Sequence, residues 1–185
     1  MTNKLNTETK IDGDVIQPLI IKLKNKDGMV RRHAREAIEA AGRSATPYLI
    51  EALDSLNKNA RWEAAKALVN IKDPLAGPAL VRALMDESYE VQWLAAEALI
   101  ALGHDALVPL LEGLINDYGS IDLRRGAHHV LHDLERQHKL NHSTLYVLDE
   151  LRATEPLEPY PVSIRRSLDE LYHEQKTDMT LPGNK

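Results

Sequence analysis

The feature that most constrains the fold is an apolar pattern that recurs at intervals of about thirty residues. In each copy an apolar segment begins near a proline and ends at a leucine. These leucines are Leu23, Leu53, Leu84 and Leu114, and the prolines are Pro18, Pro47, Pro78 and Pro109. Proline is tolerated in the first turn of a helix, because its missing N–H would have no partner there. Each segment therefore predicts the first helix of a repeating unit.

A second helix is predicted after each of these leucines. Side chains that favour helix N-caps stand there, namely Asp27, Asn57, Ser88 and Ser120. The apolar residues that follow are spaced i, i+4, i+7, i+8 and i+11, which places them on one face of a helix. Gly42 and Gly103 stand where a helix C-cap is expected. Each copy is thus a helical hairpin.

A single hairpin cannot bury its apolar stripe, so neighbouring hairpins must stack and share a continuous core. We therefore predict an all-α fold, a right-handed α-solenoid of about four hairpins over residues 14–135. Residues 136–175 are predicted to form helices that are joined by a Pro-rich linker and cap the solenoid. The polar tails, 1–13 and 176–185, are predicted to be disordered.

The second helices also carry a family resemblance. The segments VRRHAREAIEAAG, ARWEAAKALVNIKD and VQWLAAEALIALG resemble the second helix of HEAT repeats. The short period is similar to the bacterial and archaeal subclass named after phycobilisome lyases. The resemblance implies a solenoid whose second helices line the concave side, which is where such proteins usually bind their partners.

Composition excludes several classes of function. The net charge is -5, so a general positive field for nucleic acid is missing and nucleic acid is an unexpected partner. The chain has no cysteine, which removes disulfides, thiolate nucleophiles and cysteine-ligated zinc. Charged residues interrupt every apolar segment, so we expect neither a leader peptide nor a membrane span, and a cytoplasmic location fits the composition.

The candidate site lies on the face of the second helices that points away from the core. Positions two, five, six and nine residues after the first apolar residue lie there, given about 100° per residue. Trp62 and Trp93 occupy equivalent places on this face of adjacent helices, and basic or titratable residues flank them. The residues predicted to contact a partner are Trp62, Trp93, Val69, Ile100, Arg32, Arg35, Lys66, Arg125, His129 and His132.

Two features of this face leave alternatives open. The tryptophans form either an exposed partner groove or a packing contact between adjacent repeats. His128, His129 and His132 are either a solvated or partner-contacting cluster or a set of metal ligands. One helix supplies all three imidazoles, whereas a metal site needs ligands that converge, so we expect no metal.

Catalysis is not expected either. Deoxyhypusine hydroxylase, a HEAT-type enzyme, carries His-Glu pairs early in its second helices, and this chain has Arg32-His33, Trp62-Glu63, Trp93-Leu94 and Arg125-Gly126 there. HEAT-like DNA glycosylases use a strongly basic surface, which this chain does not offer. Neither a phosphate-binding glycine loop nor a nucleophile elbow is found. No cofactor is expected.

Two hypotheses on function follow. In the first, the chain is a non-catalytic scaffold that binds a protein partner, as a peptide or a helix, on the concave face. In the second, it resembles the phycobilin lyases, and the tryptophans hold a flat tetrapyrrole in a small-molecule binding or chaperone subunit. Phycobilin lyases typically act as paired longer chains, so we prefer the first hypothesis.

Overall fold

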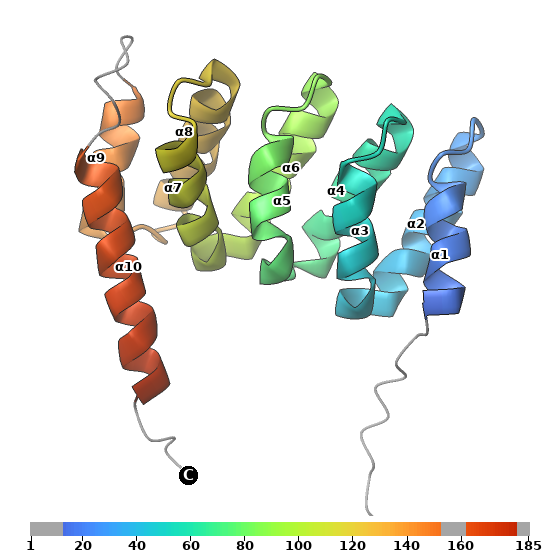
Figure 1. Ribbon diagram of the computed structural model, residues 1–185, viewed down its shortest axis with the longest axis horizontal. Coiled ribbons are helices and arrows are strands. Elements are labelled where there is room, and N and C mark those ends of the chain that lie inside the picture. The colour runs from blue at the N-terminus through green and yellow to red at the C-terminus, as the bar shows by residue number, and fades with distance from the viewer. Residues whose placement is uncertain (1–12, 153–161, 181–185) are drawn as a thin grey trace, which may run out of the picture.

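The computed structural model describes residues 13–152 and 162–180, in which all regular structure is helical (Figure 1). The α-helices are α1 (Gly13–Lys22), α2 (Gly28–Ala41), α3 (Thr46–Leu53), α4 (Lys58–Ile71), α5 (Gly77–Ala83), α6 (Tyr89–Leu102), α7 (Leu107–Asn116), α8 (Ile121–Arg136), α9 (His142–Leu151) and α10 (Val162–Thr180). Short 3-10 turns, η1 (Gly42–Ala45), η2 (Pro74–Ala76) and η3 (Gly103–Ala106), join successive hairpins. The architecture is the predicted α-solenoid.

The four second helices, α2, α4, α6 and α8, begin at the predicted N-caps. The Asp27 carboxylate accepts a hydrogen bond from the Met29 amide at 2.8 Å, and the Asn57 side chain accepts one from the Ala60 amide at 3.2 Å. Ser120 likewise caps α8, whereas the Ser88 hydroxyl donates to the Glu90 carboxylate at 2.7 Å. Asp27, Asn57 and Ser120 each satisfy an N–H group that the first turn leaves unpaired, whereas the Ser88 side chain accepts no such bond.

The ends of the helices agree less uniformly with the prediction. Gly42 and Gly103 end α2 and α6 with a φ of 66°, a conformation that favours glycine. Pro47 and Pro78 lie in the first turns of α3 and α5. Pro18 does not, because α1 begins at Gly13 and continues past the proline.

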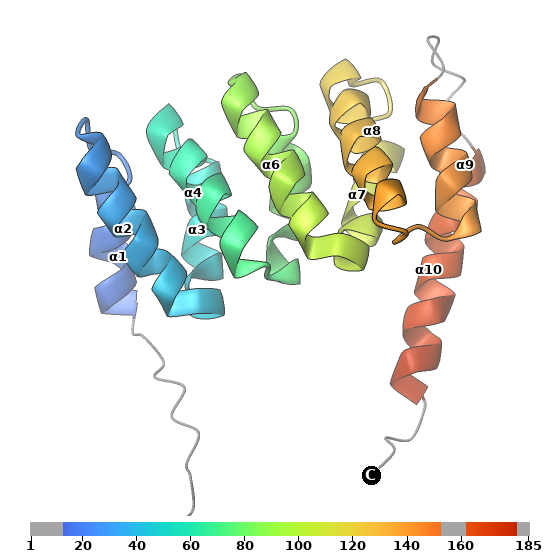
Figure 2. The same cartoon turned by 180° about the vertical axis from the view of Figure 1, so that it is seen from behind.

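The hairpins stack in one row, with α1, α3, α5 and α7 on one side and α2, α4, α6 and α8 on the other (Figures 1 and 2). Neighbouring second helices contact each other more extensively than neighbouring first helices do, which places the second helices on the inner side of the stack. The buried leucines and alanines of both rows form one continuous core. We call the surface formed by α2, α4, α6 and α8 the second-helix face.

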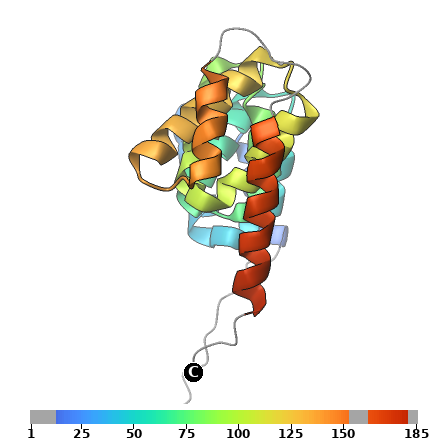
Figure 3. The ribbon, with the colours of Figure 1, turned by 90° about the vertical axis from the view of Figure 1, so that its left-hand side faces the viewer.

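The C-terminal helices lie across the end of this row (Figure 3). Helix α10 packs against both α7 and α9, and it buries Ile164, Leu168 and Leu171. It continues to Thr180, beyond the boundary at residue 175 expected from the sequence, because the helical pattern persists through polar residues. The predicted disorder is wrong for Gly13 and for residues 176–180, which are helical, whereas the rest of both tails and the Pro-rich linker lie outside the described residues.

One apolar segment of the core, Tyr89–Asn116, has the length and hydropathy of a membrane span. In the structure this segment is two helices, α6 and α7, which separate at the positive φ of Gly103. Half of its most apolar stretch is buried among the other helices. Its hydrophobicity is therefore that of a core segment.

Candidate binding site

Each pair of neighbouring second helices meets along a seam, and the same two positions of the repeat can be compared at each seam. Successive residues are rotated by about 100°, so a residue five positions after the first apolar residue projects sideways rather than directly away from the core. On the next helix, the residue three positions after the first apolar residue projects back toward it. At the seam between α2 and α4, these residues are Arg35 and Glu63, joined by an ion pair of 3.0 Å.

The seam between α4 and α6 uses the same two positions with apolar residues. Ala65 and Leu94 stand there, and both are buried. Ala65 and its counterpart Ala96 were expected on the exposed face. They are only 0% and 3% exposed, because Ala65 faces the closed seam with α6 and Ala96 lies at the base of the groove between α6 and α8. The exposed face is consequently narrower than the sequence pattern indicates.

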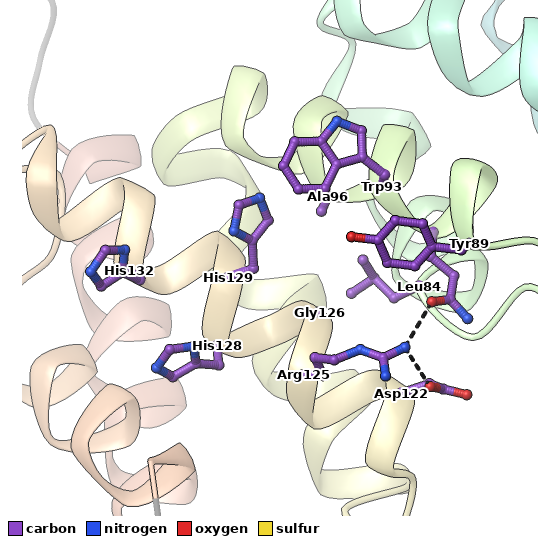
Figure 4. A pocket seen from close by; sticks show the side chains of 11 residues that line it. Leu84, Tyr89, Trp93, Ala96, Asp122, Arg125, Gly126, His128, His129 and His132 are labelled. Carbon is purple, nitrogen blue, oxygen red and sulfur yellow. Dashed lines mark hydrogen bonds and ion pairs between the residues drawn. The ribbon is translucent and has the colours of Figure 1, made fainter.

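The seam between α6 and α8 carries two small residues, Ala96 and Gly126, at these positions. A Cβ atom on Gly126 would lie 2.9 Å from Cδ2 of Leu84, so α8 approaches the first-helix layer closely at this point. With no larger side chain at either position, a hollow of about 320 Å³ opens between the two helices (Figure 4). The residues that line it are Leu84, Tyr89, Gln92, Trp93, Ala96, Asp122, Arg125, Gly126, His128, His129 and His132.

Aromatic rings form one wall of the hollow. Trp93 on α6 stacks on His129 of α8, with ring centroids 4.9 Å apart and planes inclined by 29°. Tyr89 lies one helical turn before Trp93 and also faces the hollow (Figure 4). Trp93 is 46% exposed, so the stack leaves much of the indole open to a ligand.

The rim near the start of α8 is polar. Arg125 donates hydrogen bonds to Asp122 at 2.7 Å and to Gln92 at 3.0 Å, which ties α8 to α6 (Figure 4). Its side chain remains more than half exposed. Both hydrogen bonds come from Nη2, so the N–H groups of Nη1 and Nε of Arg125 are left to donate to a carboxylate, and this rim favours an acidic group.

Two further histidines extend the hollow along α8. His128 and His132 stack with centroids 6.0 Å apart. Burial lowers the pKa of His128, and the positive charges of Arg152, His132 and His129 lower it further. The imidazole of His128 is therefore neutral at neutral pH and can act as both donor and acceptor.

The structure brings together only part of the predicted partner-binding set. Four predicted residues line the hollow, namely Trp93, Arg125, His129 and His132. The others lie elsewhere on the second-helix face, namely Trp62, Val69, Ile100, Arg32, Arg35 and Lys66.

Some of these six have structural roles. Trp62, Val69 and Ile100 are half-buried and pack against the core. Arg35 is held by Glu39 and Glu63, so its charge is already paired. The two tryptophans therefore differ: Trp93 lines an open hollow, whereas Trp62 contributes to packing.

Sequence reasoning missed several lining residues, most clearly Tyr89, Gln92 and Asp122. Tyr89 and Trp93 are four residues apart on one helix, a spacing that makes side chains neighbours. The sequence alone could therefore have placed Tyr89 beside Trp93 in the candidate site. The pairing of Arg125 with Gln92 and Asp122 carried no comparable signal, because it depends on how two repeats are placed.

Comparison with known proteins agrees with the fold. Residues 16–88 match the family of HEAT repeats. The matched segment runs from α1 to the N-cap of α6, and the same hairpin geometry continues through α8, so the α-solenoid is consistent with the fold that HEAT repeats form. No curated protein has a sequence that matches this chain. The hollow lies almost entirely after the matched segment, with Leu84 as its one lining residue inside it.

Proposed function

We propose that this chain is a cytoplasmic, non-catalytic scaffold that binds a protein partner through the hollow between α6 and α8. HEAT repeats commonly mediate protein–protein interaction, and the matched repeats support this class of function. The observation that carries the proposal is the partly exposed Trp93 beside a hollow with an apolar floor. Aromatic residues beside a concave apolar surface commonly contribute most of the binding energy of an interface.

The chemistry of the hollow indicates what the partner presents. Leu84 and Ala96 offer an apolar floor, and Trp93 offers a flat aromatic surface. Arg125 and His132 add positive or hydrogen-bonding groups at the rim. A peptide with a large apolar side chain and an acidic residue nearby satisfies both parts, since the apolar group fills the hollow and the carboxylate pairs with Arg125.

The tetrapyrrole hypothesis has less support. It requires Trp62 and Trp93 to form one exposed stripe, and only Trp93 lines the hollow. The volume of about 320 Å³ is also at the lower end of the range for small-molecule sites. We therefore retain the scaffold as the proposed function.

The proposal can be tested with a random peptide library displayed on phage and selected against the intact chain. We expect the selected peptides to share a large apolar residue near an acidic one. Fluorescence polarisation with a labelled peptide then measures the affinity. Replacing Trp93 with alanine should weaken binding by about 30-fold or more, the loss typical of a dominant interface residue.

Trp62→Phe is the matched control, because it alters the equivalent tryptophan of the preceding repeat and keeps an aromatic ring in the core. This variant should bind the peptide as the unchanged chain does. If no peptide family is enriched, or if the selected peptides bind the Trp93→Ala variant equally well, the hollow is not the partner site.

A further inference from the structure

A cluster of metal-ligating side chains lies beside the hollow and extends over both helices. Glu97 comes from α6, and His129 and Asp133 come from adjacent turns of α8. One potential ligand atom from each residue lies within 4.8 Å of the other two. The potential ligands of this cluster converge from two helices, whereas His128, His129 and His132 all come from α8.

The imidazole of His129 is the most informative member. Its Nε2 atom is shielded from solvent and has no hydrogen-bond partner among the described residues. The closest charged oxygen, Oε1 of Glu97, is 3.7 Å away, beyond hydrogen-bonding distance. A buried polar atom without a partner is costly, and a bound ion is one of the few arrangements that satisfies it.

The distances fit a small divalent cation. Zinc binds nitrogen and oxygen ligands at about 2.0–2.2 Å, so two ligands of a tetrahedral site are separated by roughly 3.4 Å. The 3.7 Å between His129 and Glu97 is close to this value. The side chains are half-buried rather than locked in the core, so a modest rotation of the carboxylates brings the whole set around one ion.

The surroundings also hold these ligands in place. Trp93 stacks on the His129 ring and limits its rotation (Figure 4). Asp133 is one helical turn after His129, a spacing that places both on one face of α8. Arg136 donates to one oxygen of Asp133 at 3.3 Å, a contact that orients the carboxylate and leaves its other oxygen available.

We propose that Glu97, His129 and Asp133 form a binding site for a divalent transition metal, with zinc as the best match. One imidazole and two carboxylates suit zinc and similar ions, whereas calcium and magnesium prefer oxygen ligands alone. Three protein ligands leave a fourth position for water or for a group of a bound partner. The site shares His129 with the hollow, but metal binding is measured without any peptide, so the two proposals can fail independently.

The test is isothermal titration of zinc chloride into the tag-free chain at neutral pH. We expect one zinc ion per chain. His129→Gln and Glu97→Gln should each weaken binding by at least roughly 100-fold, since even outer-shell partners commonly contribute 10- to 100-fold. His33→Gln, an exposed histidine of α2, is the control and should bind zinc with unchanged affinity.

A second readout does not depend on calorimetry. In a Trp62→Phe background Trp93 is the single tryptophan, and cobalt bound next to His129 should quench its fluorescence. Glu97→Gln is nearly isosteric and keeps the test valid if His129→Gln does not fold. The proposal is overturned if zinc does not bind, if both variants bind it normally, or if His132→Gln abolishes binding that His129→Gln retains.

Discussion

Replacing Glu63 with glutamine should destabilise the chain far more than replacing Glu36, although both carboxylates pair with arginines of α2. The Glu63 side chain is only 5% exposed and accepts hydrogen bonds from Arg31 at 3.2 Å and from Arg35 at 3.0 Å. Glu36 pairs with Arg32 in an exposed i, i+4 contact at 2.7 Å. The two substitutions remove the same chemical group from very different surroundings.

The expected magnitudes follow from burial. Breaking a fully buried ion pair costs about 3–5 kcal/mol, because the remaining charge is left without a partner. The side chains of Arg31 and Arg35 are 21% and 14% exposed, and Arg35 retains Glu39, so we expect about 2–3 kcal/mol for Glu63→Gln. Glu36→Gln should change the free energy of unfolding very little, because water screens this exposed pair.

Urea denaturation followed by circular dichroism measures both values. With a slope of about 2 kcal/mol per molar urea, Glu63→Gln should lower the midpoint by about 1–1.5 M, whereas the midpoint of Glu36→Gln should stay close to that of the unchanged chain. The comparison requires that the free energy of unfolding falls with urea at the same slope in the unchanged chain and in both variants. A changed slope would mean that the repeats unfold separately. Equal midpoint shifts for the two variants would refute the argument that burial sets the value of the Glu63 pairs.

Two further predictions concern the third and fourth repeats. Gly126→Ala should destabilise the chain by about 1 kcal/mol in urea denaturation. Overpacking against buried Leu84 costs about 1–3 kcal/mol, and the higher helix propensity of alanine offsets about 1 kcal/mol of this cost. A stabilised variant would contradict the close packing. The hydrogen bond from the Ser88 hydroxyl, with further contributions from the backbone amide of Glu90 and from Lys58, lowers the pKa of Glu90 from near 4.5 to about 2. A carboxyl with a lowered pKa stabilises the folded state above its unfolded pKa, and this contribution is lost as the pH falls toward 2. Urea midpoints of Glu90→Gln should thus vary less between pH 5 and pH 2 than those of the unchanged chain, and identical pH profiles would contradict the assignment.

Local sequence signals predicted the framework well. The caps Asp27, Asn57 and Ser120 act through bonds to amides two or three residues away, so their role depends on a few neighbouring residues. The apolar stripe of each second helix is likewise a property of one helix. Such features can be inferred from a single repeat without knowing how the repeats stack.

The candidate site was predicted less completely, because it arises between repeats. The sequence pattern assigned Trp62 and Trp93 the same role, since each stands at the same position of its helix. Their surroundings differ because Ala65 faces a buried seam, whereas Ala96 faces Gly126 across an open one. Likewise, Glu97 joins His129 only through the placement of α6 beside α8. Periodicity within one helix contains no information about such pairs.

The seam positions give the chain a modular character. In a stacked repeat protein each unit contacts mainly its neighbours, so the residues of one seam can change without rearranging the others. Here the ionic seam of Arg35 and Glu63 holds the first two hairpins together, and the seam of Ala96 and Gly126 opens the hollow. Exchange of α6 and α8 for other second helices would keep the first two hairpins and alter ligand preference. Stability and specificity can therefore evolve at separate seams of the same stack.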